Sequence, residues 1–194
     1  MTAMSGFEVQ VCRSAPWTGF ARRVVLPWAT SGVSLDGHGL EIGGGSGAMA
    51  DALLRRHVRA RLTVTDVDPR MVETAAARLA PLGARADVAL ADATALPYDS
   101  GTFDFACSWL MLHHTVRWPA VLSELTRVVR PGGRLVGYDL SAAGVARFLH
   151  RGDGADRLVD PADLGDELAA RGWIDRVVAP AVAGQLMRFT ARHP

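Results

Sequence analysis

Lysine is absent from this sequence of 194 residues, and all 21 of its basic residues are arginine. The absence excludes mechanisms that need a lysine Schiff base or the phosphate-binding lysine of a Walker-type loop. Cysteine is also scarce: Cys12 and Cys107 are too few for a disulfide framework, and neither belongs to a Cys-x-x-Cys metal pair. The most apolar segment, 103–112, is about half the ~20 residues that a bilayer-spanning helix needs, so it predicts a buried strand that runs into a turn.

Composition and length indicate one globular domain. Hydrophobic residues make up 49% and charged residues 21% of the chain, and the formal net charge is +1, so nothing in this balance demands nucleic acid as a partner. The first residues lack the basic stretch and apolar run of a secretory signal. We therefore expect a cytoplasmic protein, monomeric or homodimeric and without a membrane segment, with a helical cap or lid over 1–35 and a ligand-binding domain over 36–194.

From about residue 40 onward, short apolar runs alternate with helical patterns, which is typical of βαβ units around a parallel sheet. Strands are predicted over 40–42, 61–65, 88–90, 102–108 and 134–139. Helices are predicted over 46–59, from the Asp68-Pro69 start signal to near Gly83, over 118–129 up to Pro131-Gly132-Gly133, and from Asp160-Pro161 to Arg171. The runs 174–178 and 185–190 predict a closing antiparallel pair, whereas 141–159 has no clear pattern.

A glycine-rich turn, Gly43-Gly44-Gly45-Ser46-Gly47, follows the first predicted strand and opens the first predicted helix. Glycine has no Cβ and tolerates positive φ, so this backbone can approach a ligand closely at a helix N-terminus. The turn alone is ambiguous, because Gly43-x-Gly45-x-x-Ala48 also satisfies the relaxed dinucleotide fingerprint of NAD and FAD enzymes.

Two acids near this turn narrow the choice of ligand. Glu41 precedes the turn, and unit charges about 4 Å apart interact by roughly 4 kcal/mol at an effective dielectric of about 20, which disfavours a pyrophosphate and favours a cationic ligand such as S-adenosylmethionine. Asp66 ends the second predicted strand, where a carboxylate could accept hydrogen bonds from both ribose hydroxyls, although NAD enzymes also place an acid here. Asp68 is interpreted instead as the cap of the following helix.

Further motifs follow in a fixed order. They are Glu41-x-Gly43-x-Gly45-x-Gly47, Asp66, Ala91-Asp92-Ala93 with Leu96-Pro97, Phe103-Asp104, Leu112-His113-His114, and Glu124-x-x-Arg127-Val128-Val129-Arg130-Pro131-Gly132-Gly133. With these motifs, residues 40–139 resemble the class I S-adenosylmethionine-dependent methyltransferases, and most closely the broad domain family called type 11.

The resemblance implies a doubly wound, Rossmann-like α/β fold with a seven-stranded sheet, one strand of it antiparallel, and helices on both faces. It also implies S-adenosylmethionine as cofactor and S-adenosylhomocysteine as product. In that family the acid that matches Asp92 accepts from the adenine amino group, and the backbone N–H that matches Ala93 faces the ring. We further expect Val67 and Ser108 to contact the cofactor, together with Glu41, Gly43, Gly44, Gly45, Gly47 and Asp66.

Methyl transfer is an in-line displacement at an already activated carbon, so positioning supplies much of the rate and a base is needed mainly for a neutral hydroxyl or protonated amine. The candidates that follow the fourth and fifth strands are Ser108, Trp109, His113, His114, Tyr138 and Asp139. His113 and Asp139 are the predicted catalytic residues. Neighbouring residues on a helix point about 100° apart, so only one of the two histidines is expected to face the ligand. The stretch 107–112 carries no carboxylate, and we predict no metal.

The acceptor is expected to be a small molecule with a hydroxyl, amine or carbon nucleophile. RNA or protein as acceptor stays an alternative, as does a module that binds S-adenosylmethionine without transferring its methyl group, whereas an NAD-dependent oxidoreductase does not account for the combined motifs. Trp17, Phe20 and Trp28 fit either an apolar lid or simple packing. The basic cluster Arg55, Arg56, Arg59 and Arg61 is interpreted as a solvated face.

Overall fold

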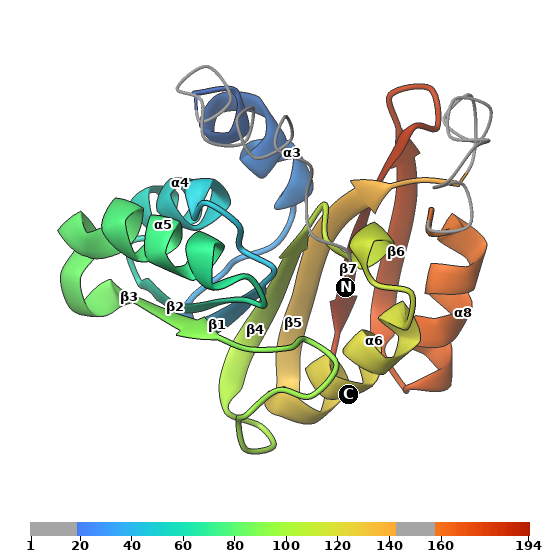
Figure 1. Cartoon of the computed structure of the whole chain (residues 1–194). Coiled ribbons are helices and arrows are strands. Elements are labelled where there is room, and N and C mark those ends of the chain that lie inside the picture. Colours follow the sequence, from blue (N-terminus) through green and yellow to red (C-terminus); the bar gives the residue numbers. More distant parts are fainter. Residues whose placement is uncertain (1–18, 143–157) are drawn as a thin grey trace.

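The computed structural model describes residues 19–142 and 158–194. They build a seven-stranded sheet in the order β3-β2-β1-β4-β5-β7-β6 (Figure 1). Its strands are β1 (Gly37–Ile42), β2 (Ala60–Asp66), β3 (Ala86–Leu90), β4 (Phe103–Trp109), β5 (Val129–Leu140), β6 (Ile174–Ala181) and β7 (Leu186–Arg192). Strand β7 runs antiparallel to β5 and β6, and the other pairings are parallel. The predicted doubly wound fold with one antiparallel strand is confirmed.

Helices cover both faces of this sheet, as Figure 1 shows. The helical segments are η1 (Ala21–Val25), α3 (Leu26–Ala29), α4 (Ala48–Arg56), α5 (Pro69–Leu79), η2 (Ala80–Arg85), η3 (Leu112–His114), α6 (Trp118–Val128) and α8 (Pro161–Ala170). One hydrophobic core lies between the sheet and α3, α4 and α5, and a second lies between the opposite face and α6 and α8. The side of the sheet on which a residue lies therefore decides which core it meets.

Strand β1 shows how this alternation places a charged residue. Leu40 and Ile42 belong to the core beneath α6 and α8. Because successive strand residues point to opposite faces, Glu41 points toward the core beneath α4, where Val64 is buried. An acid thus occupies an interior position just before the glycine turn.

Two helices begin at the cap signals that the sequence contains. The Asp68 carboxylate accepts a hydrogen bond from the Arg70 backbone N–H at 2.9 Å, and the Asp160 carboxylate accepts one from the Ala162 N–H at 2.8 Å. A proline follows each cap, at a position where the missing N–H would have no helical partner. Both predicted helix starts are confirmed.

Substituting Asp68 by alanine is expected to destabilise the fold by about 0.5–2 kcal/mol, because the first turn of α5 loses its side-chain acceptor. Chemical unfolding followed by circular dichroism measures this loss. Glu73→Ala is the matched control, since Glu73 is exposed on the same helix, and it is expected to stay within about 0.5 kcal/mol of the parent protein. Equal stability of the Asp68→Ala and parent proteins would contradict the capping role.

Some predicted boundaries are wrong. Helix α5 ends at Leu79 and continues as the 3-10 segment η2, because Pro81 lacks the N–H that the helix needs. Strand β5 begins at Val129, directly after α6, so Pro131-Gly132-Gly133 lies inside the strand and not before it. The pairing of β5 with β4 is irregular there. A Cβ on Gly133 would lie 2.7 Å from the Asp104 carbonyl oxygen, so the close approach of the two backbones requires glycine.

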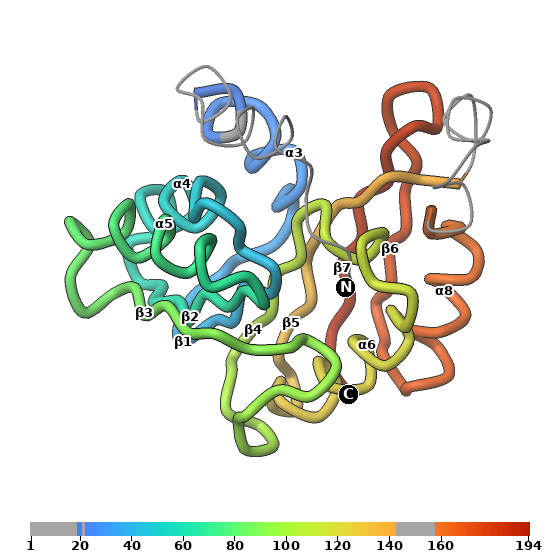
Figure 2. The backbone as a smooth tube through the Cα atoms, viewed as in Figure 1, coloured from blue at the N-terminus to red at the C-terminus, as the bar shows by residue number. Residues whose placement is uncertain are grey.

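The helical segment from residue 19 to Ala29 lies beyond the carboxyl end of β4 (Figure 2). The Trp28 ring packs edge-on against Tyr138 of β5, with ring centroids 5.8 Å apart. Phe20 is half exposed. Cys12 and Trp17 lie outside the described residues. The segment therefore contacts the end of the sheet from which the turns with the predicted site residues depart.

No helix within 19–142 and 158–194 is both long enough and apolar enough to cross a membrane.

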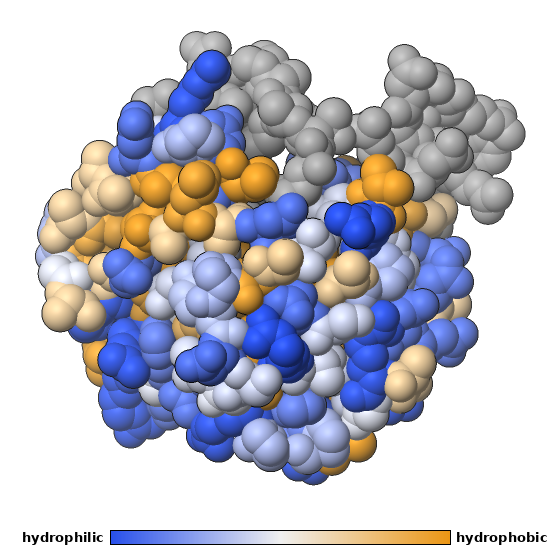
Figure 3. All heavy atoms as spheres, turned by 60° about the horizontal axis from the view of Figure 1, so that its bottom comes forward, coloured by the Kyte–Doolittle hydropathy of each residue, from blue (hydrophilic) through white to orange (hydrophobic). Residues whose placement is uncertain are grey.

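Figure 3 brings forward the side of the molecule at which β4 and β5 begin. Hydrophilic residues predominate on it, and the hydrophobic residues gather toward its upper left.

Candidate active site

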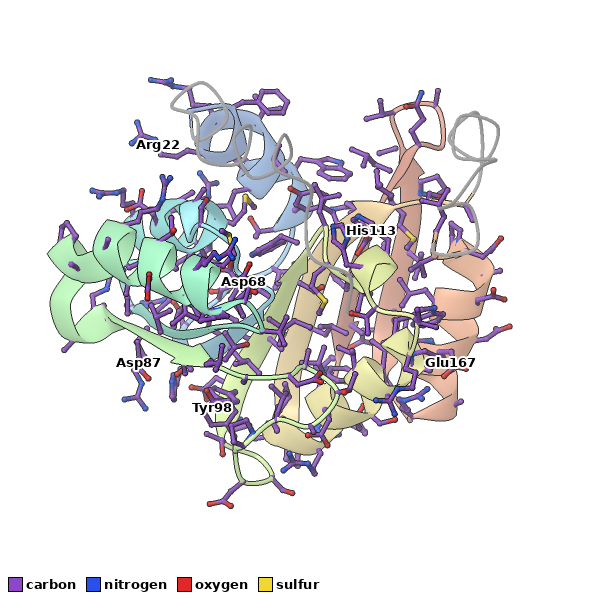
Figure 4. The ribbon with its side chains drawn as sticks, viewed as in Figure 1. Arg22, Asp68, Asp87, Tyr98, His113 and Glu167 are labelled. Atoms are coloured by element: carbon purple, nitrogen blue, oxygen red, sulfur yellow. The ribbon has the colours of Figure 1, made fainter. Side chains whose placement is uncertain are left out.

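The predicted site residues meet where the strand order changes direction. Strands β1 and β4 are neighbours, but the chain leaves β1 toward α4 on one face and leaves β4 through η3 toward α6 on the other. Open α/β sheets bind ligands at such a point, outside the carboxyl ends of the strands. In Figure 4, Asp68 lies at the α5 side and His113 on η3, on either side of the end of β4.

The glycine turn has a backbone that other residues adopt only with strain. Gly43, Gly45 and Gly47 have φ values of +59°, +53° and +74°. The Gly44 N–H donates to the Thr65 carbonyl of β2 at 2.9 Å, and the Gly47 N–H donates back to the Gly44 carbonyl at 2.9 Å. The turn is thereby fixed against β2 before α4 begins.

The turn glycines differ in what surrounds them. A Cβ on Gly43 would lie 2.2 Å from Cγ of Met111, and one on Gly44 would lie 2.3 Å from Cγ1 of Val64. These two positions are closed by packing. A Cβ on Gly45 would meet no atom of the described residues within 4 Å. Gly45 therefore presents bare backbone on its open side, where a ligand can approach.

Glu41 is 1% exposed, and neither of its carboxylate oxygens has a hydrogen-bond partner in the described part of the chain. Burial raises the pKa of Glu41 to about 8, and the nearby Trp109 indole lowers it only in part. That indole N–H is close to the carboxylate but does not reach hydrogen-bond geometry. Burial, with a smaller contribution from Glu41, also raises the pKa of the Cys107 thiol, which disfavours a reactive thiolate at this position.

Asp66 holds the turn in place. Its Oδ2 accepts the Gly45 N–H at 2.9 Å, and its Oδ1 accepts the Asp68 N–H at 2.9 Å. Each carboxylate oxygen has a second lone pair, so Asp66 can still accept two hydroxyl groups. Val67, between the two acids, is 41% exposed. The two carboxylates thus divide as expected: Asp68 caps α5, and Asp66 does not.

Asp92 and Ala93 follow directly after β3, next to the end of β2. Oδ1 of Asp92 accepts both the N–H and the hydroxyl of Thr94 at 2.8 Å. The Thr94 backbone N–H is the main cause of the lowered pKa of Asp92. The side chain is exposed, and its Oδ2 has no partner among the described residues, so it can accept a further donor. Ala93 is buried.

His113 and Asp139 form a pair. Nδ1 of His113 lies 2.5 Å from Oδ1 of Asp139, whose side chain is fully buried. Asp139 also accepts the Leu112 N–H on Oδ2 and the Leu140 N–H on Oδ1, each at 2.7 Å. The same carboxylate therefore orients the imidazole and fixes the start of η3. Both residues were predicted from the sequence as candidates, but no sequence pattern indicated that they are in contact.

The other candidates after β4 have distinct surroundings. The His113 and His114 rings lie with centroids 4.0 Å apart at the end of η3, which is a single 3-10 turn. That only one of the two histidines faces the ligand stays a prediction. Ser108 is fully buried, and its hydroxyl has no partner in the described residues. Trp109 packs against Tyr138 with centroids 5.8 Å apart.

Leu110 was missed by sequence reasoning. It has a φ of +52°, which is strained for a bulky residue, and its N–H donates to the Tyr138 carbonyl at 2.9 Å. This conformation turns the chain from β4 into η3 and brings Met111 against Gly43. Nothing in the residue type signals it, because leucine seldom takes this conformation.

Within 19–142 and 158–194, no three His, Cys, Asp or Glu side chains gather where they could hold a metal ion. The absence of a metal stays a prediction, since it concerns the protein in solution.

Comparisons with known proteins agree with this geometry. Residues 40–159 match the sequence profile of the methyltransferase domain family. The malonyl-[acyl-carrier protein] O-methyltransferase of Halorhodospira halophila is 30% identical over 165 residues, which cover 80% of this chain and 53% of that protein. A ubiquinone/menaquinone biosynthesis C-methyltransferase of Paracoccus denitrificans is 36% identical over 107 residues, covering 54% of this chain and 42% of that protein. The chain thus spans about half the length of the curated relatives that it matches.

A solved structure shows the same fold. Phosphoethanolamine N-methyltransferase 2 of Haemonchus contortus, in complex with phosphomonomethylethanolamine and S-adenosylhomocysteine, superposes with a TM-score of 0.80 at 14% identity, covering 100% of this chain and 59% of that one. At this identity the likeness concerns the fold alone. Because the family profile covers more than half of its length, this chain belongs to the methyltransferase domain family, as its resemblance to class I S-adenosylmethionine-dependent methyltransferases led us to expect.

Proposed function

We propose that this chain binds S-adenosylmethionine and transfers its methyl group to a small organic acceptor, with His113 as general base and Asp139 as the residue that positions it. The observation that carries the proposal is the His113–Asp139 pair at the end of β4, beside a glycine turn with an open backbone at Gly45. A base and a nucleoside-type turn thus lie at the same end of the sheet.

The residues around the turn fit this cofactor. Glu41 offers a buried carboxylate that has no hydrogen-bond partner in the described part of the chain, which suits a cationic group. Asp66 keeps lone pairs for the ribose hydroxyls, and Asp92 keeps Oδ2 for the adenine amino group. The full set proposed to hold the cofactor is Glu41, Gly43, Gly44, Gly45, Gly47, Asp66, Val67, Asp92, Ala93 and Ser108. When bound, the cofactor supplies a methyl group that its sulfonium already activates.

The hydrogen bond to Asp139 decides which nitrogen of His113 can act. Asp139 accepts two backbone N–H groups, so it is an acceptor toward the ring as well, and Nδ1 carries the proton. Nε2 then holds the free lone pair and has no hydrogen-bond partner in the described residues. We assign to Nε2 the removal of the acceptor's proton during transfer, a role that contributes about 10²–10⁴-fold in enzymes.

A base of this kind suits an acceptor that must lose a proton, such as a neutral hydroxyl or a protonated amine. The names of the two relatives, an O-methyltransferase and a C-methyltransferase, support an acceptor of small-molecule type. The surface charge also supports a small molecule, and not RNA, as the acceptor. The arginines at 55, 56, 59 and 61 are all exposed, and Arg55 and Arg59 are paired with Asp51 and Asp36.

The segment 1–35 is proposed to cover the acceptor. The contact between Trp28 and Tyr138 supports this role, because it holds the end of the segment over the carboxyl end of β5. An aromatic wall at this place would exclude water from the reacting atoms.

Calorimetry with S-adenosylmethionine, S-adenosylhomocysteine and NAD tests the cofactor. Micromolar binding, about −8 kcal/mol, is expected for the first two and none for NAD. A screen with labelled methyl groups against metabolite extracts, with RNA and protein pools in parallel, tests the acceptor. Label transferred only to RNA or protein would overturn the small-molecule assignment, and NAD binding alone would overturn the proposal as a whole.

A further inference from the structure

Arg188 lies on β7, near the end of the sheet that carries the candidate site. It is the register partner of Tyr138 on β5, so it lies opposite the residue that precedes Asp139. Its neighbours Met187 and Phe189 belong to the core beneath α6 and α8. Because successive strand residues point to opposite faces of a sheet, the Arg188 side chain points to the other face, toward α3.

The guanidinium of Arg188 makes two long hydrogen bonds. Its Nη1 donates to the carbonyl oxygens of Trp28 and Ser31, each at 3.4 Å. Hydrogen bonds of this type usually measure about 2.7–3.2 Å, so both contacts are weak. An arginine side chain has five N–H donors, and neither Nε nor Nη2 of Arg188 has a partner in the described part of the chain. Most of the donors of this half-buried side chain are therefore unused.

No carboxylate of the described residues balances the charge of Arg188. The neighbouring strands contain two acids: Asp139 on β5 binds His113, and Asp175 on β6 binds Arg192. The segments η1 and α3, which lie on the same side of the sheet as Arg188, contain no acid. A partly buried cation costs free energy unless an anion or hydrogen-bond acceptors compensate it. An arginine in this state beside the candidate site favours an anionic ligand.

Arg188 and the His113–Asp139 pair flank the end of β5 on two sides. Asp139 points to the face of α6 and α8, since its neighbour Tyr138 belongs to the core beneath α3. Arg188 is opposite Tyr138, and such partners on antiparallel strands have Cβ atoms about 4.5–5.5 Å apart. The two carbonyls that Arg188 contacts belong to the segment proposed to cover the acceptor. A ligand across this strand end, beneath that segment, can meet both the imidazole and the guanidinium.

Resting on the proposed function, we propose that Arg188 binds an anionic group, a carboxylate or a phosphate monoester, that the acceptor carries apart from its methylated atom. A guanidinium matches either group, because two parallel N–H donors face two oxygens. The anion forms no covalent bond and keeps its charge, so the methylated product is anionic as well. The acceptor is thus a small acid with a separate nucleophile, and Arg188 contributes to its specificity.

The charge of the methylated product tests the inference before the acceptor is identified. The parent protein is incubated with S-adenosylmethionine that carries a labelled methyl group and with an extract of small metabolites. The products then pass over an anion exchanger at neutral pH. Labelled products that the exchanger retains support the anion site. Labelled products that are all unretained overturn it.

Two treatments of the extract distinguish the two anions. Coupling to methylamine with a carbodiimide converts carboxylates to neutral amides, and a phosphatase removes phosphate monoesters. Loss of labelled product after the first treatment alone identifies a carboxylate, and loss after the second alone identifies a phosphate. Labelling that persists undiminished after both treatments overturns the inference.

Arg188→Gln removes the charge and keeps a polar side chain. At low acceptor concentration, its rate of methyl transfer to the anionic fraction of the extract should fall by about 10- to 100-fold, the scale of hydrogen bonds to a charged group. A higher concentration of that fraction should restore most of the rate, because KM changes and kcat does not. Arg188→Lys should recover part of the loss, since lysine keeps the charge without the paired donors.

Arg192→Gln is the matched control, because Arg192 lies on the same face of β7 and its substitution removes the same charge. It pairs with Asp175 at the opposite end of the strand, where β5 approaches its start. An exposed ion pair contributes little, so this variant should keep its rate within about twofold of the parent. Equal losses in the two variants, or a loss in Arg188→Gln that a higher acceptor concentration does not restore, would indicate a structural role and overturn the inference.

The outcomes separate this inference from the proposed function. Methyl transfer to neutral or cationic products alone overturns the anion site and leaves the methyltransferase assignment standing. Absence of both S-adenosylmethionine binding and methyl transfer to any product overturns the proposed function itself. The cofactor affinity of Arg188→Gln should equal that of the parent protein, because β7 carries none of the proposed cofactor contacts. A loss of cofactor affinity as large as the loss of rate would contradict a role toward the acceptor.

Discussion

His113→Gln is expected to lower the rate of methyl transfer at saturating cofactor by about 10²–10⁴-fold, because glutamine cannot take up the acceptor's proton. The affinity for S-adenosylmethionine should change by less than about twofold, since His113 lies after β4 and the proposed cofactor contacts lie mainly after β1, β2 and β3. Single-turnover kinetics with the identified acceptor measures the rate, and calorimetry measures the affinity.

His114→Gln is the matched control for this substitution. The two rings lie side by side, but it is His113 that contacts Asp139. The control variant should keep its rate within a few-fold of the parent. Similar losses for both variants would indicate that the histidines only shape η3, and an active His113→Gln protein would remove the general base from the mechanism.

Asp66→Ala is expected to weaken S-adenosylmethionine binding by tenfold or more. Hydrogen bonds to a charged group contribute about 1.5–3 kcal/mol each, and the ribose would lose its acceptor for both hydroxyls. The Gly45 N–H would lose its acceptor too, so the turn would be less firmly held. Calorimetric titration of the variant and the parent protein at the same pH measures the change.

Asp68→Ala separates the ligand role of Asp66 from a merely local effect. Asp68 lies two residues away and caps α5, so its loss should lower stability but leave cofactor affinity within about twofold. If both variants lose affinity equally, the carboxylate of Asp66 has no special role toward the ribose.

Local signals in the sequence predicted much of the fold. Asp68-Pro69 and Asp160-Pro161 predicted helix starts because capping needs only an acceptor and a proline next to it in the chain. The glycine turn was predictable for the same reason, since positive φ at Gly43, Gly45 and Gly47 is a property of the residue type. The alternation of predicted strands and helices likewise indicated that Asp66 and Asp92 follow the ends of successive strands.

These local signals could not predict contacts between residues that are far apart in the sequence. His113 and Asp139 are 26 positions apart, and their hydrogen bond depends on β4 and β5 being neighbours in register. The burial of Glu41 depends on the neighbouring strands, where Val64 and Cys107 are its register partners, and no local pattern encodes this pairing. The start of β5 at Val129 was missed because a strand that pairs with β4 overrides the turn preference of Pro131-Gly132-Gly133.

Asp139 illustrates why such a residue is hard to interpret from sequence. Its carboxylate accepts the Leu112 N–H and the Leu140 N–H while it holds the imidazole of His113. Asp139 therefore caps the end of β5 and orients the imidazole of His113 at the same time. Tests of this residue need a readout of rate as well as of stability, and for this reason the substitutions above target the ring and leave its anchor intact.

The most direct test of the account is a crystal structure of the chain with S-adenosylhomocysteine. The account predicts the ribose hydroxyls on the Asp66 carboxylate, the ammonium against Glu41, the adenine amino group toward Asp92, and the sulfur on the side of the turn that faces His113. A ligand bound away from the carboxyl ends of β1 and β2, or one whose ribose and ammonium contact none of these acids, would contradict it.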